Sequence, residues 1–240
     1  MKISLITLLF SLFFLSGFCQ FMNYEVRGRY QLPVKKEKLN EARFISDFLP
    51  GYPTKWITEY ISVEILATSN GNTTKAVSAN NFLSTAQKNI LKTAELASDI
   101  IIKVHYKNKN AVTAKIESNR MNIKVTVVPE IEAEYIGGYQ ELKKYLKVNA
   151  IDKISEPSMF VRVVTASRFQ PPFKAAKVIF SVNEEGKIVN AIISKTSGDA
   201  KTDKILTDAI NKMPQWKPAE NEKGIKVKQE FEFSVGKDGC

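Results

Sequence analysis

The clearest pattern in the chain is an alternation of apolar and charged positions near its C-terminus. Over residues 224–235, one set of alternate positions is mostly apolar and the other is charged or polar. A period of two is typical of a β-strand with one buried face and one solvent-facing face. The apolar set is Ile225, Val227, Phe231, Phe233 and Val235, and the polar set is Lys226, Lys228, Glu230, Glu232 and Ser234.

The residues before this strand predict a β-hairpin followed by a helix. Residues 176–182 alternate apolar and more polar side chains, and residues 183–187 supply a turn in which Gly186 can adopt a positive φ. Residues 188–194 have the composition of the return strand. Apolar side chains then recur at helical spacing over residues 203–213. The predicted order of this part of the chain is strand, strand, helix, strand.

The first half of the chain predicts a mostly β domain with one inserted helix. Four segments have the alternating or β-branched composition of strands, namely residues 24–30, 56–67, 99–106 and 121–128. Ser84 can cap a short helix in which Ile90, Leu91 and Ala94 share one side. We therefore expect a β-rich domain over residues 20–128.

Residues 129–157 predict a linker that contains a helix. Gly137-Gly138 breaks an extended segment, and Leu142, Tyr145 and Leu146 then recur at helical spacing. The remaining residues, 158–240, form the predicted C-terminal domain. The chain as a whole is predicted to belong to the α+β class.

The first 19 residues predict a signal peptide. A basic start precedes the apolar run Ile3–Leu15, and small residues at Gly17 and Cys19 fit cleavage before Gln20. We therefore expect an exported chain in the periplasm or cell envelope. One alternative is retention as a membrane anchor, although spanning a bilayer takes roughly 20 apolar residues. Lipidation of Cys19 is another alternative, and the bulky Phe18 disfavours it.

The net charge and the cysteine content limit the kinds of partner and of covalent link that the chain can have. The formal net charge of +10 favours contact with anionic surfaces. The lysines are spread along the chain without interleaved aromatics, so we expect solvated lysine faces and no nucleic-acid partner. After cleavage Cys240 would be the only cysteine, which excludes an intramolecular disulfide and leaves an inert thiol or an intermolecular disulfide as alternatives.

Catalytic motifs are missing from the sequence. His105 is the single histidine, and the chain has no nucleophile elbow or glycine-rich phosphate loop. We expect no enzyme activity, no catalytic residue, no metal site and no cofactor.

The C-terminal block resembles a known family. The hairpin, the helix, the segment Gln215-Trp216-Lys217-Pro218 and the final strand together resemble the C-terminal domain of the TonB energy-transducer family. The order Pro129-Glu130, Gly137-Gly138 and Leu142–Leu146 resembles the lead-in to such domains in Bacteroidetes-type proteins. The resemblance implies a β-β-α-β domain in which Trp216 covers the core and Pro218 fixes the path into the last strand. A stacking role for Trp216 toward a sugar or base is the alternative interpretation.

A weaker resemblance concerns the first half of the chain. Residues 75–82, 97–102 and 122–125 resemble parts of the β-rich C-terminal domains of the gliding-motility protein GldM. This resemblance implies a small sandwich-like domain used for contact with other proteins.

The TonB resemblance also implies a binding site. In that family the last strand offers an edge on which an extended peptide of an outer-membrane transporter pairs through its backbone. Carried onto this chain, it implies partner-binding residues at two places. These are Lys226, Lys228, Glu230 and Glu232 in the last strand, and Gln170, Pro171 and Pro172 before the first strand of the domain. The charges of the last strand can also be interpreted as protection against edge-to-edge aggregation.

The sequence therefore predicts an exported, non-catalytic binding module. It would recognise a peptide or envelope protein by β-strand addition at the last strand, with an outer-membrane transporter as the expected partner. Membrane contact is expected only if the N-terminal segment is retained, and a homodimer through the last strand is a further alternative. A membrane-anchored TonB-type transducer is the alternative function, but the short apolar segment and scattered prolines depart from a complete transducer.

Overall fold

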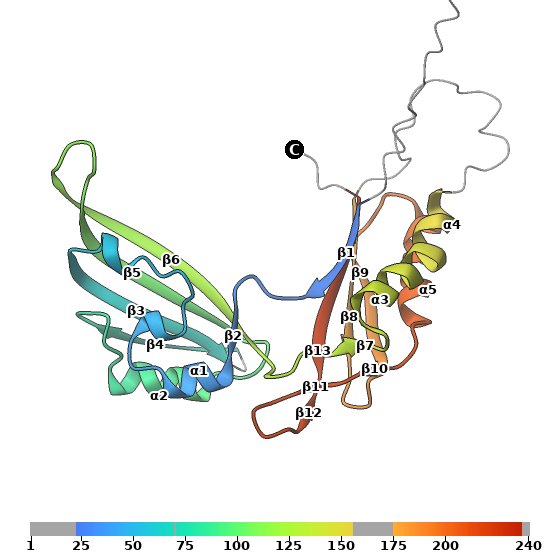
Figure 1. Ribbon diagram of the computed structural model, residues 1–240, viewed down its shortest axis with the longest axis horizontal. Helices are drawn as coiled ribbons and strands as arrows, with labels where there is room; N and C mark the ends of the chain where they lie inside the picture. The colour runs from blue at the N-terminus through green and yellow to red at the C-terminus, as the bar shows by residue number, and fades with distance from the viewer. Residues whose placement is uncertain (1–22, 70, 156–174, 237–240) are drawn as a thin grey trace, which may run out of the picture.

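The structure, a computed structural model, describes residues 23–69, 71–155 and 175–236. The predicted signal peptide and its cleavage site lie outside the described residues. The chain is of the α+β class, as predicted, and its buried apolar side chains form two separate cores. Figure 1 shows the corresponding two units, with the N-terminal unit on the left and the C-terminal unit on the right.

The N-terminal unit contains a mixed sheet of five strands. The order across the sheet is β2-β6-β5-β3-β4, and only the β2–β6 pair is parallel. Its elements are β2 (Pro33–Lys35), α1 (Lys36–Glu41), two 3₁₀ turns (Ile45–Asp47 and Thr54–Trp56), β3 (Glu59–Ser69), β4 (Asn72–Ser78), α2 (Thr85–Thr93), β5 (Asp99–Lys109) and β6 (Ile116–Val128).

Alternation along the strands decides which face of this sheet is buried. Val63, Ile102 and Val125 lie on one face and are no more than 1 % exposed, and α1 and α2 cover that face. Ser84 caps α2 as predicted, since its side chain accepts from the backbone N–H of Gln87. The predicted sandwich is wrong for the described residues. Helices, and not a second sheet, cover the core of this unit.

Lys36 joins the two helices of the N-terminal unit. The last carbonyl groups of a helix have no intrahelical donor. The Lys36 ammonium donates to the carbonyls of Leu91 at 3.1 Å and Lys92 at 2.7 Å, and also to that of Ala94. A side chain from α1 thus caps the C-terminal end of α2.

We expect Lys36→Met to lower the free energy of unfolding of the N-terminal unit by about 1–2 kcal/mol, because carbonyl groups at a helix end lose a charged donor. Urea titration followed by circular dichroism measures this loss. Lys38→Met is the matched control, because the Lys38 side chain is exposed on the same helix. Equal effects of the two substitutions would contradict the capping role.

The C-terminal unit contains the predicted β-β-α-β order within a sheet of four strands. The order across the sheet is β1-β13-β8-β9, and every pair is antiparallel. Its elements are β1 (Tyr24–Gly28), β7 (Glu134–Tyr135), α3 (Gly138–Leu146), a π-helical segment (Lys147–Ile151), α4 (Asp152–Ser155), β8 (Ala176–Val182), β9 (Ile188–Lys195), α5 (Ala200–Asn211), β10 (Trp216–Lys217), β11 (Ala219–Glu220), β12 (Lys226–Val227) and β13 (Gln229–Val235).

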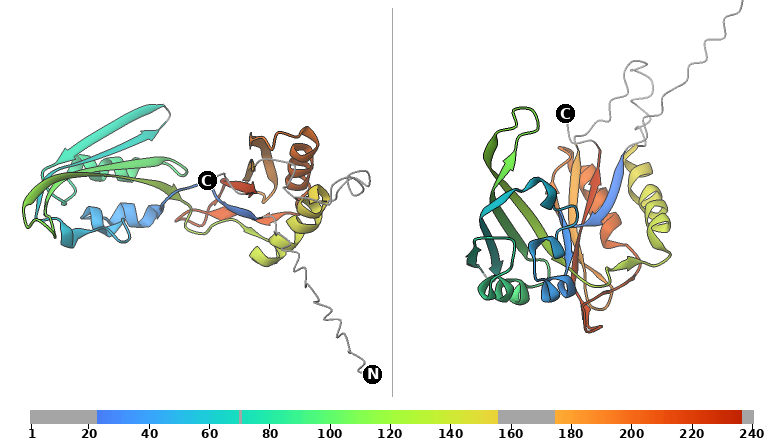
Figure 2. Two further views of the ribbon diagram at one scale, coloured as in Figure 1. Left: turned by 90° about the horizontal axis from the view of Figure 1, so that it is seen from above. Right: turned by 60° about the vertical axis from the view of Figure 1, so that its left-hand side comes forward.

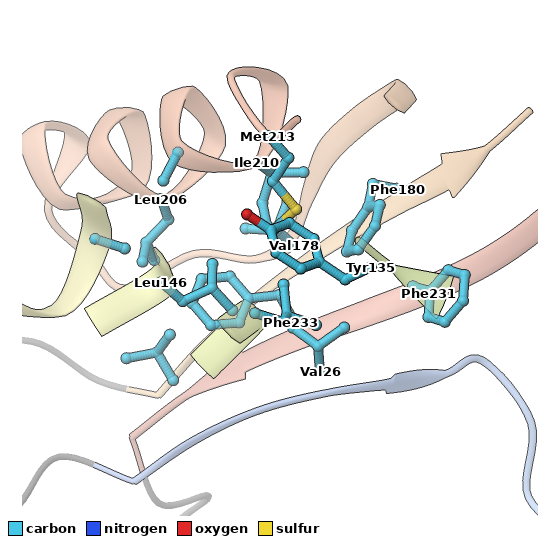
Figure 3. Close-up of a cluster of buried hydrophobic side chains, with 14 of the residues drawn as sticks. Val26, Tyr135, Leu146, Val178, Phe180, Leu206, Ile210, Met213, Phe231 and Phe233 are labelled. Carbon is cyan, nitrogen blue, oxygen red and sulfur yellow. The ribbon is translucent and has the colours of Figure 1, made fainter. Parts of the chain in front are cut away.

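The helices α3, α4 and α5 lie on one side of the four-stranded sheet (Figure 2). Leu146, Leu206 and Ile210 point from these helices toward Phe180 and Phe233 of the strands (Figure 3), and all five are no more than 1 % exposed. The helix predicted within a linker over residues 129–157 is therefore part of the core of the C-terminal unit. Its apolar stripe, read from the sequence, is the face that packs on this sheet.

The first strand belongs to the other unit. The sequence predicts that residues 24–30 open the N-terminal domain, yet β1 pairs with β13 from Tyr24↔Val235 to Gly28↔Phe231. Residues 29–32 then lead into β2, so the N-terminal unit is inserted between β1 and the remainder of the C-terminal unit (Figure 1). The prediction that residues 24–28 belong to the N-terminal domain is wrong for this reason.

Candidate functional site

The last strand is not a free edge. It pairs with β8 from Gln229↔Val182 to Val235↔Ala176 and with β1 on its other side. The predicted site of strand addition is therefore already filled by the chain's own first strand. Alternation did predict the burial of Phe231, Phe233 and Val235, but it cannot show which strand lies beside β13.

The four charged residues predicted to bind a partner do not lie along one unpaired strand edge. Glu230 accepts from Arg29, which follows β1, at 2.8 Å, and Glu232 forms ion pairs with Arg27 of β1 at 3.4 Å and Lys177 of β8 at 3.2 Å. These two carboxylates hold neighbouring strands of the same sheet. They are internal cross-strand partners in the described structure.

The two lysines of the predicted set lie before β13. Lys226 is in β12, which pairs with β11 in a small separate ladder through Glu220↔Lys226. Lys228 is an exposed residue between β12 and β13. Gln229 is a polar residue at one of the positions that alternation predicts to be buried. Its side chain is buried there, accepting from the Ala133 backbone N–H at 2.7 Å and donating to Glu132 at 2.9 Å.

Among the four charged residues predicted to bind a partner, Glu232 has a clearly shifted pKa. Partial burial opposes its ionisation, but hydrogen bonds and charge from Lys177 and Arg27 outweigh burial and lower the pKa of Glu232. A lowered pKa in the folded state contributes stability that is fully present above the ordinary glutamate pKa. That contribution disappears as the pH falls through the lower, folded-state value.

We expect Glu232→Gln to lower the free energy of unfolding by about 1 kcal/mol near neutral pH, because two cations lose their shared partner. The difference from the unsubstituted protein should shrink as the pH falls below about 4.3, the ordinary pKa of glutamate. Urea titrations across this range measure it. Glu230→Gln, at a more exposed ion pair, is the control with the smaller expected cost. A pH-independent difference for Glu232→Gln would contradict the linkage.

The remaining predicted residues divide into one core residue, one loop residue and three that the structure does not describe. Trp216 is 3 % exposed and contacts the rings of Tyr135, Phe180 and Phe231. Its core role is confirmed, and its burial excludes a stacking platform. Pro218 lies between β10 and β11 and thus on the path toward the last strand. Gln170, Pro171 and Pro172 lie outside the described residues.

The described four-stranded sheet has two edge strands, β1 on one side and β9 on the other. The edge strand with an exposed large apolar side chain is β9. Its residues pair with β8 alone, with Ile179↔Ile192 and Ser181↔Val189 in register. Ile192 is 58 % exposed, and Ile179 and Val189 are half-buried on the sheet face opposite the helices. Asn190 has a φ of 55° where the register shifts, so the regular part of the edge begins after it.

A cleft lies between the two units. The cleft has a volume of about 530 Å³, and its lining includes Glu37, Glu41, Glu130, Glu220 and Glu222. Glu130 is partly neutralised, since it accepts from the Glu37 backbone N–H at 3.2 Å and lies 3.7 Å from the Lys35 ammonium. The cleft assembles residues from three distant segments, which no local sequence pattern could predict.

His105 lies on an open sheet face, away from this cleft. Its Nε2 and the Ser118 hydroxyl are 2.7 Å apart across the β5–β6 pair. Within the described residues, no group of three or more histidine, cysteine, aspartate or glutamate side chains could hold a metal ion. No helix in the same residues is long and apolar enough to cross a membrane.

Comparisons with models of known protein families, with curated proteins and with solved structures each find no match. The resemblances to the TonB and GldM families therefore stay predictions from the sequence.

Proposed function

We propose that this chain is an exported, non-catalytic binding protein that recognises an extended segment of a cell-envelope protein by strand addition at β9. The observation that supports this most directly is the exposed Ile192 on an unpaired strand edge. An unpaired edge presents a row of backbone N–H and C=O groups, which an extended segment can satisfy.

The neighbouring side chains favour a short apolar ligand. Ile192 and Ile179 are side by side in register, and Val189 follows on the same face. Alternate side chains of an added strand would pack against this strip, which gives specificity beyond the backbone hydrogen bonds. The register of the β8–β9 pair shifts at two places, near Asn190 and between Ile193 and Lys195. The expected ligand segment is therefore short.

The arrangement of the titratable groups supports a non-catalytic role. The His105 ring contacts Ser118 on an exposed pair of strands, where water competes with any reaction. The carboxylates with clearly lowered pKa values serve structural contacts. Asp199 caps α5 by accepting from Thr202, and Asp203 accepts from the Ser197 backbone and from Thr196.

Amide NMR with a peptide panel tests the proposal. Extended peptides taken from periplasmic segments of outer-membrane transporters are titrated into the isotope-labelled protein. We expect the largest amide shifts within Ile188–Lys195, and we expect Ile192→Lys to weaken binding about tenfold or more, since a charge on an edge strand opposes pairing. Lys201→Glu, on the exposed side of α5, is the surface control.

Two results would contradict the proposal in different ways. Shifts confined to β1 and β13 would place strand addition at the opposite edge, either beside β1 or through its displacement. No shift with any peptide, at concentrations that saturate weak binders, would exclude strand recognition of this class of partner.

A further inference from the structure

The N-terminal sheet has a face that no helix of the described residues covers. The helices α1 and α2 pack against one face, and every second residue of β5 from Ile101 to Lys109 points to the other. The register places Lys124 opposite Ile101, Arg120 opposite His105 and Ile116 opposite Lys109. We name this surface the basic face. Its cationic side chains are Lys75, Lys103, Lys107, Lys109, Arg120 and Lys124.

Only half of these cations are neutralised. Glu59 pairs with Lys107 at 2.9 Å, Glu64 with Lys103 at 3.0 Å and Asp99 with Lys124 at 2.6 Å. Within the part of the chain that the structure describes, Lys75, Lys109 and Arg120 form no ion pair, and all three are exposed. The basic face therefore carries a net positive charge.

Apolar side chains extend this face at the end of the β5–β6 hairpin. The strand β3 begins at Glu59, which pairs with Lys107, so the residues beyond Lys107 project past the neighbouring strand (Figure 1). Val112 in the hairpin turn is 93 % exposed, and Ile116 is 67 % exposed. Large apolar side chains at a protruding tip, next to cations, fit a partner with both an apolar and an anionic region.

We propose that the basic face and the hairpin tip bind an anionic lipid surface. Lysines near such a surface gain electrostatic attraction, and apolar residues beside them enter the boundary between headgroups and acyl chains. A nucleic acid fits this face less well. Lysines outnumber arginine, no aromatic side chain alternates with them on this face of β5 and β6, and stacking or bidentate base contacts would need those groups.

This inference is independent of strand addition at β9, which lies in the other unit. It also changes two expectations from the sequence. Lysines that are spread along the chain converge on one face because strands alternate, and membrane contact would not require the N-terminal segment.

Vesicle flotation with the full chain tests the proposal. The probes are vesicles of phosphatidylcholine with and without phosphatidylglycerol. Combined Lys75→Glu, Lys109→Glu and Arg120→Glu should weaken binding to the anionic vesicles about a hundredfold, since each cation near the surface contributes about fivefold. Combined Lys201→Glu, Lys212→Glu and Lys223→Glu changes the net charge equally on exposed positions of the other unit, and should change binding by less than about threefold. The apolar N-terminal run is common to all variants and cancels in this comparison.

A second variant separates the apolar from the charged contribution. Val112→Ser with Ile116→Ser should reduce the binding that remains at about 1 M salt, where charge interactions are screened within about 3 Å. Equal loss of binding for the two charge-reversal variants would overturn the proposal. So would binding to duplex DNA that the basic-face variant abolishes while vesicle binding stays unchanged. Circular dichroism confirms that each variant is folded.

Discussion

Gly186→Ala should destabilise the C-terminal unit by about 3 kcal/mol or more. Gly186 has a φ of 76° in the β8–β9 turn, a conformation that costs an alanine about 1–2 kcal/mol. A Cβ at this position would also lie inside contact distance of the Trp216 carbonyl oxygen. That oxygen cannot move freely, because the Trp216 N–H donates to the Gly186 carbonyl at 2.7 Å.

Gly198→Ala is the matched control for the Gly186 substitution. Gly198 has a φ of 84°, but a Cβ there would meet no atom within 4 Å. It should therefore show the conformational cost alone, about 1–2 kcal/mol. Urea titration followed by circular dichroism measures both variants, since the fluorescence of Trp216 would itself change. Equal losses would show that the approach of Trp216 to the turn contributes nothing.

The Gly186 site shows what local sequence reasoning can and cannot supply. The turn, its glycine and both flanking strands can be predicted from residues 176–194, because a period-two pattern and turn chemistry are local properties. The contact with Trp216 joins positions far apart in the sequence. It follows from the packing of the C-terminal core, and no local pattern encodes it.

The difference between local patterns and distant contacts also explains why the burial of β13 is predicted correctly and its neighbouring strand β1 is not. Alternation correctly predicts the buried face of β13, and it places Glu230 and Glu232 correctly on the opposite face. Their partners cannot be predicted in this way, since Arg27 and Arg29 lie about 200 positions away in the sequence. Strand pairing at such separation depends on which edge remains open after the remainder of the sheet has formed.

The N-terminal unit is harder to predict for a different reason. Its longer strands are recognisable, but β2 and α1 lie in a lysine-rich stretch that has the composition of a connection. Leu39 is 1 % exposed within α1, yet a helix of one and a half turns shows too little periodicity for recognition. Composition therefore predicts a mostly β domain with one helix, and the sandwich is implied by the GldM resemblance. The free edge at β9 and the basic face also cannot be predicted from the sequence, because both depend on how the strands pair and in which register.

Val26→Asp should weaken the pairing of β1 with the last strand, β13. Val26 is 8 % exposed and opposite Phe233, so a carboxylate there would be buried without a partner. We expect a loss of about 3 kcal/mol in the free energy of unfolding of the C-terminal unit. Glu25→Ala, at the exposed neighbouring position, should cost less than about 0.5 kcal/mol. Thermal unfolding monitored by Trp216 fluorescence distinguishes the two.

A peptide of residues 23–30, added in trans to the Val26→Asp protein, should restore most of the lost stability in a concentration-dependent way. Val26 is the apolar side chain of β1 that is buried in the core, and the other contacts of this segment include backbone pairing and the ion pairs of Arg27 and Arg29. A strand with so small an apolar contribution can be replaced by a separate peptide. The same peptide carrying Val26→Asp is the control and should have no effect. If the unsubstituted peptide also failed, β1 would be a fixed part of the fold, and strand exchange at β13 would be excluded.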